Sequence, residues 1–193
     1  TAASLEPMLR PSAVAVIGDL ARAKIQPNVY SPDDLVRVTS FLEQGGTLIL
    51  LQRGRDLFKT PQGTEWLVRT IGYDKPVARA PVAALGPFEL LDTNHAWTKH
   101  LNGAKVGWLA APPNASEFAL KATRGERLIG DRDGRAMLFR QRIGRGQFVY
   151  LGWSPAASLP ATRDVASSVE NELNFEQQMQ VLLRIAADVT ANQ

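Results

Sequence analysis

The stretch Phe41-Leu-Glu-Gln-Gly-Gly-Thr-Leu-Ile-Leu-Leu51 decides the fold, because it joins the end of a helix to the start of a buried strand. The segment Ser31-Pro-Asp-Asp34 predicts where that helix begins, since serine is a good cap and proline suits the first helical position. Its two aspartates favour the positive end of the helix dipole. The pair Gly45-Gly46 ends the helix. Thr47 to Leu51 then form a continuous apolar run, which is typical of a strand buried on both faces.

A second apolar run lies upstream, at Ala13 to Ile17, and ends in Gly18-Asp19. Strand, helix and strand in this order predict a parallel pair joined by a right-handed crossover. The residues before it, Thr1 to Arg10, have the pattern of a short helix. Because an α/β sheet usually opens with a strand, we expect this chain to be part of a longer protein.

The rest of the chain predicts further helices and a hairpin. Thr60-Pro61 opens a helix that Gly72 closes. Arg135 to Arg140 and Gln147 to Leu151 flank a glycine turn, which indicates an antiparallel hairpin. The last helix is expected at about Asn174 to Val189, with an apolar face of Phe175, Met179, Leu182, Leu183 and Ala186. Between them we expect strands at 88–91, 106–110, 118–122 and 127–130, and a helix at 96–101.

These elements predict a single domain, residues 1–193, of the α/β class. The expected architecture is a three-layer α/β/α sandwich with a mostly parallel, flavodoxin-like sheet and a C-terminal β-hairpin added to it.

The composition excludes several classes of protein. The chain has no cysteine, so it has no disulfide, no thiolate nucleophile and no Cys-based metal site. With 22 Lys and Arg against 19 Asp and Glu, the formal net charge is only +3. The densest basic stretch, Arg124 to Arg145, also holds acidic residues, which favours a solvated hairpin surface over a nucleic-acid-binding patch. No apolar run has the length of a membrane span.

Three segments together resemble the class I glutamine amidotransferase-like superfamily. They are the strand ending in Gly18-Asp19, the capped helix running into Phe41–Leu51, and Gly144-Arg-Gly-Gln-Phe-Val-Tyr-Leu-Gly152. The last two are similar to the amidotransferase-like domains of secreted and carbohydrate-active bacterial proteins, among them the trimerisation domain of bacterial β-galactosidases. The resemblance implies a nucleophilic Cys on a tight turn after the strand at 47–51. It also implies a His-Pro-Glu sequence after the strand at 147–151.

This sequence departs from the family at both catalytic positions. The turn after Leu51 reads Gln52-Arg53-Gly54-Arg55, with no Cys or Ser as nucleophile. After Leu151 the chain reads Gly-Trp-Ser-Pro, with neither His nor Glu. We therefore expect no catalytic residues and no glutaminase activity. The predicted function is a non-catalytic amidotransferase-like domain that serves assembly or ligand binding, with carbohydrate as the ligand that the resemblance implies.

A ligand site is expected at the carboxyl ends of the parallel strands, where open α/β sheets bind ligands. The residues predicted to gather there are Asp19, Gln52, Arg53, Arg55, Asp56, Trp153 and Ser154. The arginines suit an anionic or sugar ligand, because a guanidinium makes forked hydrogen bonds to carboxylates. The alternative is that Arg53 or Arg55 pairs with Asp19 or Asp56 as structural scaffolding.

Histidines and tryptophans are the remaining candidates. His95 and His100, the only two histidines, lie five residues apart, which on a helix separates them by about 140°. We therefore expect no shared metal ion and no cofactor. Trp97 and Trp153 sit beside loops and are the better candidates for stacking on a sugar. Packing in the core or in an interface is nevertheless the more common role for such residues.

Two other functions stay open. One is a hydrolase of different chemistry that uses Asp19, Asp56 or Ser154, and the other is an interaction domain of a periplasmic or membrane-anchored complex. The expected partners are other domains of the same polypeptide or further copies of the chain, together with a carbohydrate or small anionic ligand. Nucleic acid is not expected. The resemblance alone favours a periplasmic or secreted location over a cytoplasmic one.

Overall fold

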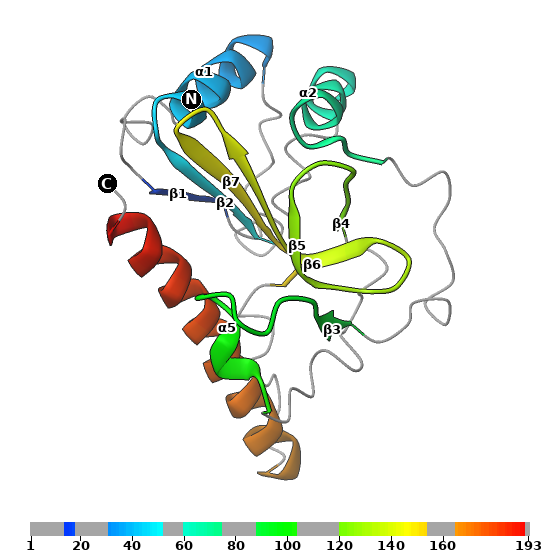
Figure 1. Ribbon diagram of the computed structural model, residues 1–193, viewed down its shortest axis with the longest axis vertical. Helices are drawn as coiled ribbons and strands as arrows, with labels where there is room; N and C mark the ends of the chain where they lie inside the picture. The colour runs from blue at the N-terminus through cyan, green and yellow to red at the C-terminus, as the bar shows by residue number, and fades with distance from the viewer. Residues whose placement is uncertain are drawn as a thin grey trace.

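The computed structural model describes residues 14–17, 31–51, 60–74, 88–103, 120–153 and 165–191. In these parts, helices cover both faces of one sheet (Figure 1). Helices α1 (Pro32–Glu43) and α2 (Pro61–Ile71) lie on one face, and the long helix α5 (Val165–Ala191) lies on the other. A short 3-10 turn, η3 (Lys99–Leu101), lies on the same side as α5.

The sheet has seven strands, which differ greatly in length. They are β1 (Val14–Ile17), β2 (Thr47–Leu51), β3 (Glu89–Leu90), β4 (Leu120–Lys121), β5 (Glu126–Gly130), β6 (Arg135–Ile143) and β7 (Gly146–Leu151). Their order is β1-β2-β7-β6-β5-β3, and β4 pairs with β6. The pairs β1–β2 and β2–β7 are parallel, whereas β7–β6, β6–β5, β5–β3 and β4–β6 are antiparallel.

The sheet is therefore mixed and mostly antiparallel, and the expected mostly parallel, flavodoxin-like sandwich is wrong. The parallel part is limited to β1, β2 and β7, where helix α1 provides the predicted crossover between the first two strands. The hairpin β6–β7 was expected as an addition to a parallel sheet. Instead β6 pairs with β7 on one side and with β5 and β4 on the other. Tight turns can join only antiparallel strands, so this half of the sheet is antiparallel.

The predicted starts of α1 and α2 are confirmed. Ser31 caps α1: its Oγ accepts the Asp34 N–H at 3.2 Å, and the Asp34 carboxylate accepts the Ser31 N–H at 3.0 Å. This reciprocal pair is a capping box. Thr60 caps α2 by accepting the Gly63 N–H at 3.0 Å. Gly72 closes α2 in the left-handed conformation, with φ of 64°.

Helix α5 differs from the prediction in both extent and orientation. It begins at Val165 rather than at about Asn174, and it is 27 residues long. Among residues 172–191, whose side chains are described, the buried apolar residues are Val181, Ile185 and Val189. Of the face expected from the sequence, Leu183 is 60% exposed, and Phe175, Met179, Leu182 and Ala186 are only partly buried. The buried stripe is thus rotated by one residue, about 100°, and it includes two polar residues, Gln177 and Gln178.

The short elements in the middle of the chain differ mainly in length. The helix expected at 96–101 is only the 3-10 turn η3, and the strand expected at 88–91 is reduced to β3. Of the strand expected at 118–122, residues 118 and 119 lie outside the described residues, and β4 covers Leu120 and Lys121. The strand expected at 127–130 is β5, which begins one residue earlier. The helix predicted at 1–10 and the strand predicted at 106–110 lie outside the described residues.

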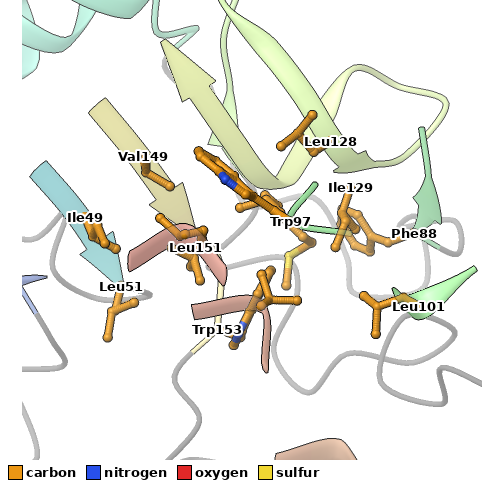
Figure 2. Close-up of a cluster of buried hydrophobic side chains, with 14 of the residues drawn as sticks. Ile49, Leu51, Phe88, Trp97, Leu101, Leu128, Ile129, Val149, Leu151 and Trp153 are labelled. Atoms are coloured by element: carbon orange, nitrogen blue, oxygen red, sulfur yellow. The ribbon is translucent and has the colours of Figure 1, made fainter. Parts of the chain in front are cut away.

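The sheet separates two apolar cores. Leu48 and Leu50 of β2 point to the α1 and α2 side, while Ile49 and Leu51 point to the α5 side, as the alternation of a strand requires. The α5-side core also takes in Trp97, Leu101 and Phe88 from the segment before β4 (Figure 2). This second core is where the sheet, the segment 88–103 and α5 meet.

Candidate functional site

The two strands that the resemblance marks as catalytic end side by side. β2 and β7 are parallel neighbours, with Leu51 opposite Leu151. The chain therefore leaves both strands at the same edge of the sheet, which is the edge where α/β proteins bind ligands. The N–H of Gly152 still donates to the carbonyl of Met137 on β6 at 2.7 Å, so β7 stays paired for one residue beyond its end.

Only Trp153 of the seven predicted ligand-binding residues lies in the described part of the chain. Outside the described residues are Asp19, Gln52, Arg53, Arg55, Asp56 and Ser154. The Trp153 side chain is 5% exposed and packs in the α5-side core near Leu151 (Figure 2). Core packing was the alternative role for this tryptophan. A ligand-binding role for the whole set stays a prediction.

The two glycine motifs that carry the resemblance pack against each other at the opposite edge. A Cβ atom on Gly146 would lie 2.1 Å from the Gly46 carbonyl oxygen and 2.3 Å from that of Leu42. The Gln147 N–H donates to the Gly46 carbonyl at 3.1 Å, and the Arg145 N–H donates to the Glu43 carbonyl at 3.2 Å. Glycine is thus required where the end of α1 meets the β6–β7 turn. In this chain the shared motif serves backbone packing.

A polar cluster on the α5 side was missed by sequence reasoning. Its centre is Trp97, which is fully buried and whose indole N–H donates to Oδ2 of Asp188 at 3.0 Å. The guanidinium of Arg140 lies over the Trp97 ring, 5.1 Å from its centroid, as in a cation–π contact. The ring of His95 meets the indole edge-on, with centroids 4.9 Å apart. One side chain therefore joins α5, β6 and the segment before η3.

Arg140 extends this cluster across the sheet. Its Nε donates to Oε1 of Gln147 at 2.9 Å, and Nε2 of Gln147 lies 3.4 Å from Oγ1 of Thr47. A guanidinium nitrogen also lies 3.9 Å from a carboxylate oxygen of Glu126. This polar row crosses β5, β6, β7 and β2. The Arg140 side chain is only 14% exposed, so the row holds a charge in the core rather than offering it to solvent.

Both histidines have a lowered pKa. Burial is the main cause for His95, and Arg140 lowers its pKa further, while Asp92, Glu126 and Asp188 oppose the change. These five residues come from four parts of the chain that meet around Trp97: the segment before η3, β5, β6 and α5. A histidine and a tryptophan close together in an irregular segment were the only signal in the sequence that pointed to this cluster.

For His100, burial is again the main cause of the lowered pKa, followed by the charge of Arg184, and the backbone of Gln177 opposes both. Arg184, which lowers the pKa of His100, and Gln177, which raises it, both belong to α5. The two histidines therefore face the same helix from one short segment. Among the described residues, no three His, Asp or Glu side chains gather as a metal site.

Comparisons with known proteins identify no family. No protein-family profile matches the chain, and no curated protein matches it. A solved structure with some likeness is the exo-β-1,4-mannosidase Op5Man5 from Opitutaceae bacterium strain TAV5, with a TM-score of 0.42 and 14% sequence identity. The match covers 93% of this chain and 26% of that one. So weak a likeness supports no statement about fold or activity.

One further property concerns membranes. None of the helices in the described part of the chain combines the length and the apolarity that crossing a bilayer requires.

Proposed function

We propose that this chain is a non-catalytic domain of the glutamine amidotransferase-like kind that serves assembly or ligand binding in a larger bacterial protein. The observation that carries the proposal is the pairing of Leu51 with Leu151. The positions of the family's nucleophile and base follow these two neighbouring residues. Gln52-Arg53 and Gly152-Trp153 supply neither an attacking thiol nor an imidazole there.

The observed topology removes one of the features that supported the resemblance to the family, because the sheet is not mostly parallel. The support consists of the parallel strands β1, β2 and β7, the capped helix α1 and the two glycine motifs that pack against each other. These features concern the scaffold, so they favour a shared architecture without its chemistry.

Two measurements on the purified chain test the catalytic half of the proposal. Ammonia release from glutamine should stay at the level of buffer, because neither of the two family positions carries a nucleophile or a base. Ammonia release above that level, removed by Arg53→Ala or Asp56→Ala, would overturn the proposal. Turnover of ester or glycoside substrates that Ser154→Ala abolishes would instead favour the hydrolase.

The binding half is tested by sedimentation velocity and by calorimetry. Assembly predicts a mass that rises with protein concentration. Ligand binding predicts heat on titration with a neutral cello-oligosaccharide or an anionic oligogalacturonate. The double variant Arg53→Ala/Asp56→Ala should weaken binding, whereas Asp33→Ala/Arg132→Ala, which removes one acid and one base elsewhere on the surface, should not. A monomer at every concentration that binds neither sugar contradicts both roles.

A further inference from the structure

The segment from Asp92 to Leu101, here called the His–Trp segment, is folded on itself and held against α5. The Asp92 carboxylate accepts the N–H groups of Asn94 and His95 at 2.9 and 3.0 Å, and the Thr98 hydroxyl donates to the Asp92 carbonyl at 2.8 Å. The segment ends in η3, where the Leu101 N–H donates to the Thr98 carbonyl at 2.9 Å. Its anchor to α5 is the hydrogen bond from Trp97 to Asp188.

His95 supports this anchor only in its neutral form. Its Nδ1 accepts the backbone N–H of Trp97 at 3.2 Å, so Nδ1 carries no proton. Protonation at Nδ1 would set two N–H groups against each other at the position of the Trp97 backbone. Around the ring stand the Arg140 guanidinium of β6 and three carboxylates, those of Asp92, Glu126 and Asp188. The carboxylates partly offset the repulsion between Arg140 and a protonated His95, but they do not replace the hydrogen bond that His95 loses.

The surroundings of His100 stabilise a positive charge less than those of His95 do. Neither ring nitrogen is accessible to solvent, and neither makes a hydrogen bond of good geometry within the described structure. The charged group that faces the ring from α5 is the guanidinium of Arg184, and the backbone of Gln177 is the other polar group beside it. A protonated, partly buried His100 would therefore lie beside another cation, with only the backbone of Gln177 to favour its charge and no carboxylate among its named neighbours.

We propose that the His–Trp segment is an acid-sensitive clamp, in which protonation of His95 and His100 releases the segment from α5. The two histidines flank Trp97 in the sequence: His95 contacts Trp97 directly, and His100 lies beside Arg184 of α5, so both charges act where the segment meets the helix. Release uncovers Trp97 and Leu101 together with Val181 and Ile185 of α5, which now share one apolar core. The inference is independent of the proposed function, because it uses no residue at the strand ends.

Hydrogen exchange of the full chain between pH 7.5 and pH 5 tests the clamp, with each amide corrected for its intrinsic exchange rate. The protection of Trp97, Lys99 and Leu101 should fall by up to about 30-fold for each histidine, a limit set by the interval between the ordinary pKa of about 6.5 and pH 5. Amides of β7 report global unfolding, so at pH 5 the segment amides should exchange faster than these and should respond less to added urea. Constant protection in the segment between the two pH values, or segment protection equal to that of β7 at pH 5, would overturn the proposal.

A proton NMR titration of the two imidazole rings is the second measurement. Both midpoints should lie below the ordinary value of about 6.5. The variant Arg184→Gln removes the facing cation and should raise the midpoint of His100 while leaving that of His95 in place. Ordinary midpoints in the natural chain, or an unchanged His100 midpoint in R184Q, would overturn the clamp.

The double variant His95→Gln/His100→Gln removes both titrating groups and retains a polar side chain at each position. Its segment should keep the same protection at pH 5 and pH 7.5, and a pH dependence equal to that of the natural chain would overturn the proposal. If the double variant does not fold, the titration of R184Q decides.

Discussion

Gly146 shows how a single residue sets the distance between a helix and a strand. The position needs glycine for space, because the carbonyl oxygens of Leu42 and Gly46 occupy the place of a side chain. Gly46 has the same steric restriction, since a Cβ there would lie 2.2 Å from the Phe41 ring. The sequence shows these glycines as a motif. Their mutual contact, across 100 residues of chain, appears only in the fold.

The variant Gly146→Ala should destabilise the protein by about 3 kcal/mol, because the clash is with backbone atoms that a rotamer change does not relieve. The measurement is the free energy of unfolding in urea. The control is Gly103→Ala, where φ is +77° but nothing lies within 4 Å of the new Cβ. It should cost about 1 kcal/mol, for the left-handed backbone alone. Equal losses in the two variants would contradict the packing role.

Trp97, unlike Gly146, is a residue whose role could not be inferred from the sequence. The sequence places it beside a loop, where sugar stacking and core packing were both open. Its indole is fully buried because two distant partners, Arg140 and Asp188, take up its ring face and its N–H. Neither partner has a sequence pattern that points to a tryptophan, since each lies more than 40 residues away.

Helix α1 is the element whose local signals were complete. Ser31, Pro32 and Asp34 act within one turn, so the start of the helix depends on residues that are neighbours in sequence. The same holds for α2 and for the β6–β7 turn. By contrast, the rotation of α5 depends on which residues the sheet and the His–Trp segment cover. Apolarity alone placed Leu183 inside and left Gln177 and Gln178 out, and both placements were wrong.

The variant Ser31→Ala should cost about 1 kcal/mol, because it removes the acceptor for the Asp34 N–H. The hydrogen bonds from Ser31 also lower the pKa of Asp34, so the natural cap is lost as the pH falls through the lowered pKa of that carboxyl. Urea unfolding at pH 7 and at pH 3 should therefore show a smaller difference between S31A and the natural chain at pH 3. Asp33→Asn, which removes a neighbouring charge outside the box, is the control and should cost clearly less.

The orientation of α5 predicts opposite outcomes for two residues only two positions apart. Ile185→Ala should destabilise the protein by about 3 kcal/mol, since the side chain is fully buried in the core beside Val181 and Val189. Leu183→Ala should change the free energy of unfolding by no more than about 0.5 kcal/mol, because that side chain is 60% exposed. The comparison is made by urea unfolding. A larger loss for Leu183→Ala would restore the helix face expected from the sequence.

At the scale of the whole molecule, the presence of both helices and strands was predictable, whereas the predicted fold class and topology were wrong. Alternating helices and apolar runs near the start indicated a parallel pair of strands, and the pairing of β1 with β2 confirms that pair. The direction of the remaining strands depends on partners that are distant or very short. β3 and β4 have two residues each, too few to display a period. The antiparallel half of the sheet is built by β6, which is long enough to pair with three strands.

The predicted ligand site at the strand ends is the feature that the sequence and the described structure determine least. Parallel pairing of β2 and β7 explains why the two predicted turns should lie near each other. It does not say which of the candidate side chains meet, because that depends on loop conformation rather than on strand register. The proposed loss of catalysis rests instead on residue types, which the sequence states directly.

The stability of the molecule should fall as the pH drops below about 6.5, whether or not the His–Trp segment is released. An unfolded histidine binds its proton near 6.5, whereas the lowered pKa values keep His95 and His100 neutral in the fold until a lower pH. Between these values the unfolded chain holds more protons, so acid favours unfolding. Above 6.5 both states are neutral, and the histidines add no slope.

The urea midpoint should accordingly be lower at pH 5 than at pH 7. Carboxylates contribute to that difference as well, so the decisive quantity is the change in the double variant His95→Gln/His100→Gln, whose midpoint should vary less over the same range. Asp34 does not confuse the comparison, because its pKa is lowered from an already acidic value and its effect falls below this window. A double variant as sensitive to acid as the natural chain would contradict the prediction, because it would show that the two rings have the same pKa in the folded and the unfolded chain.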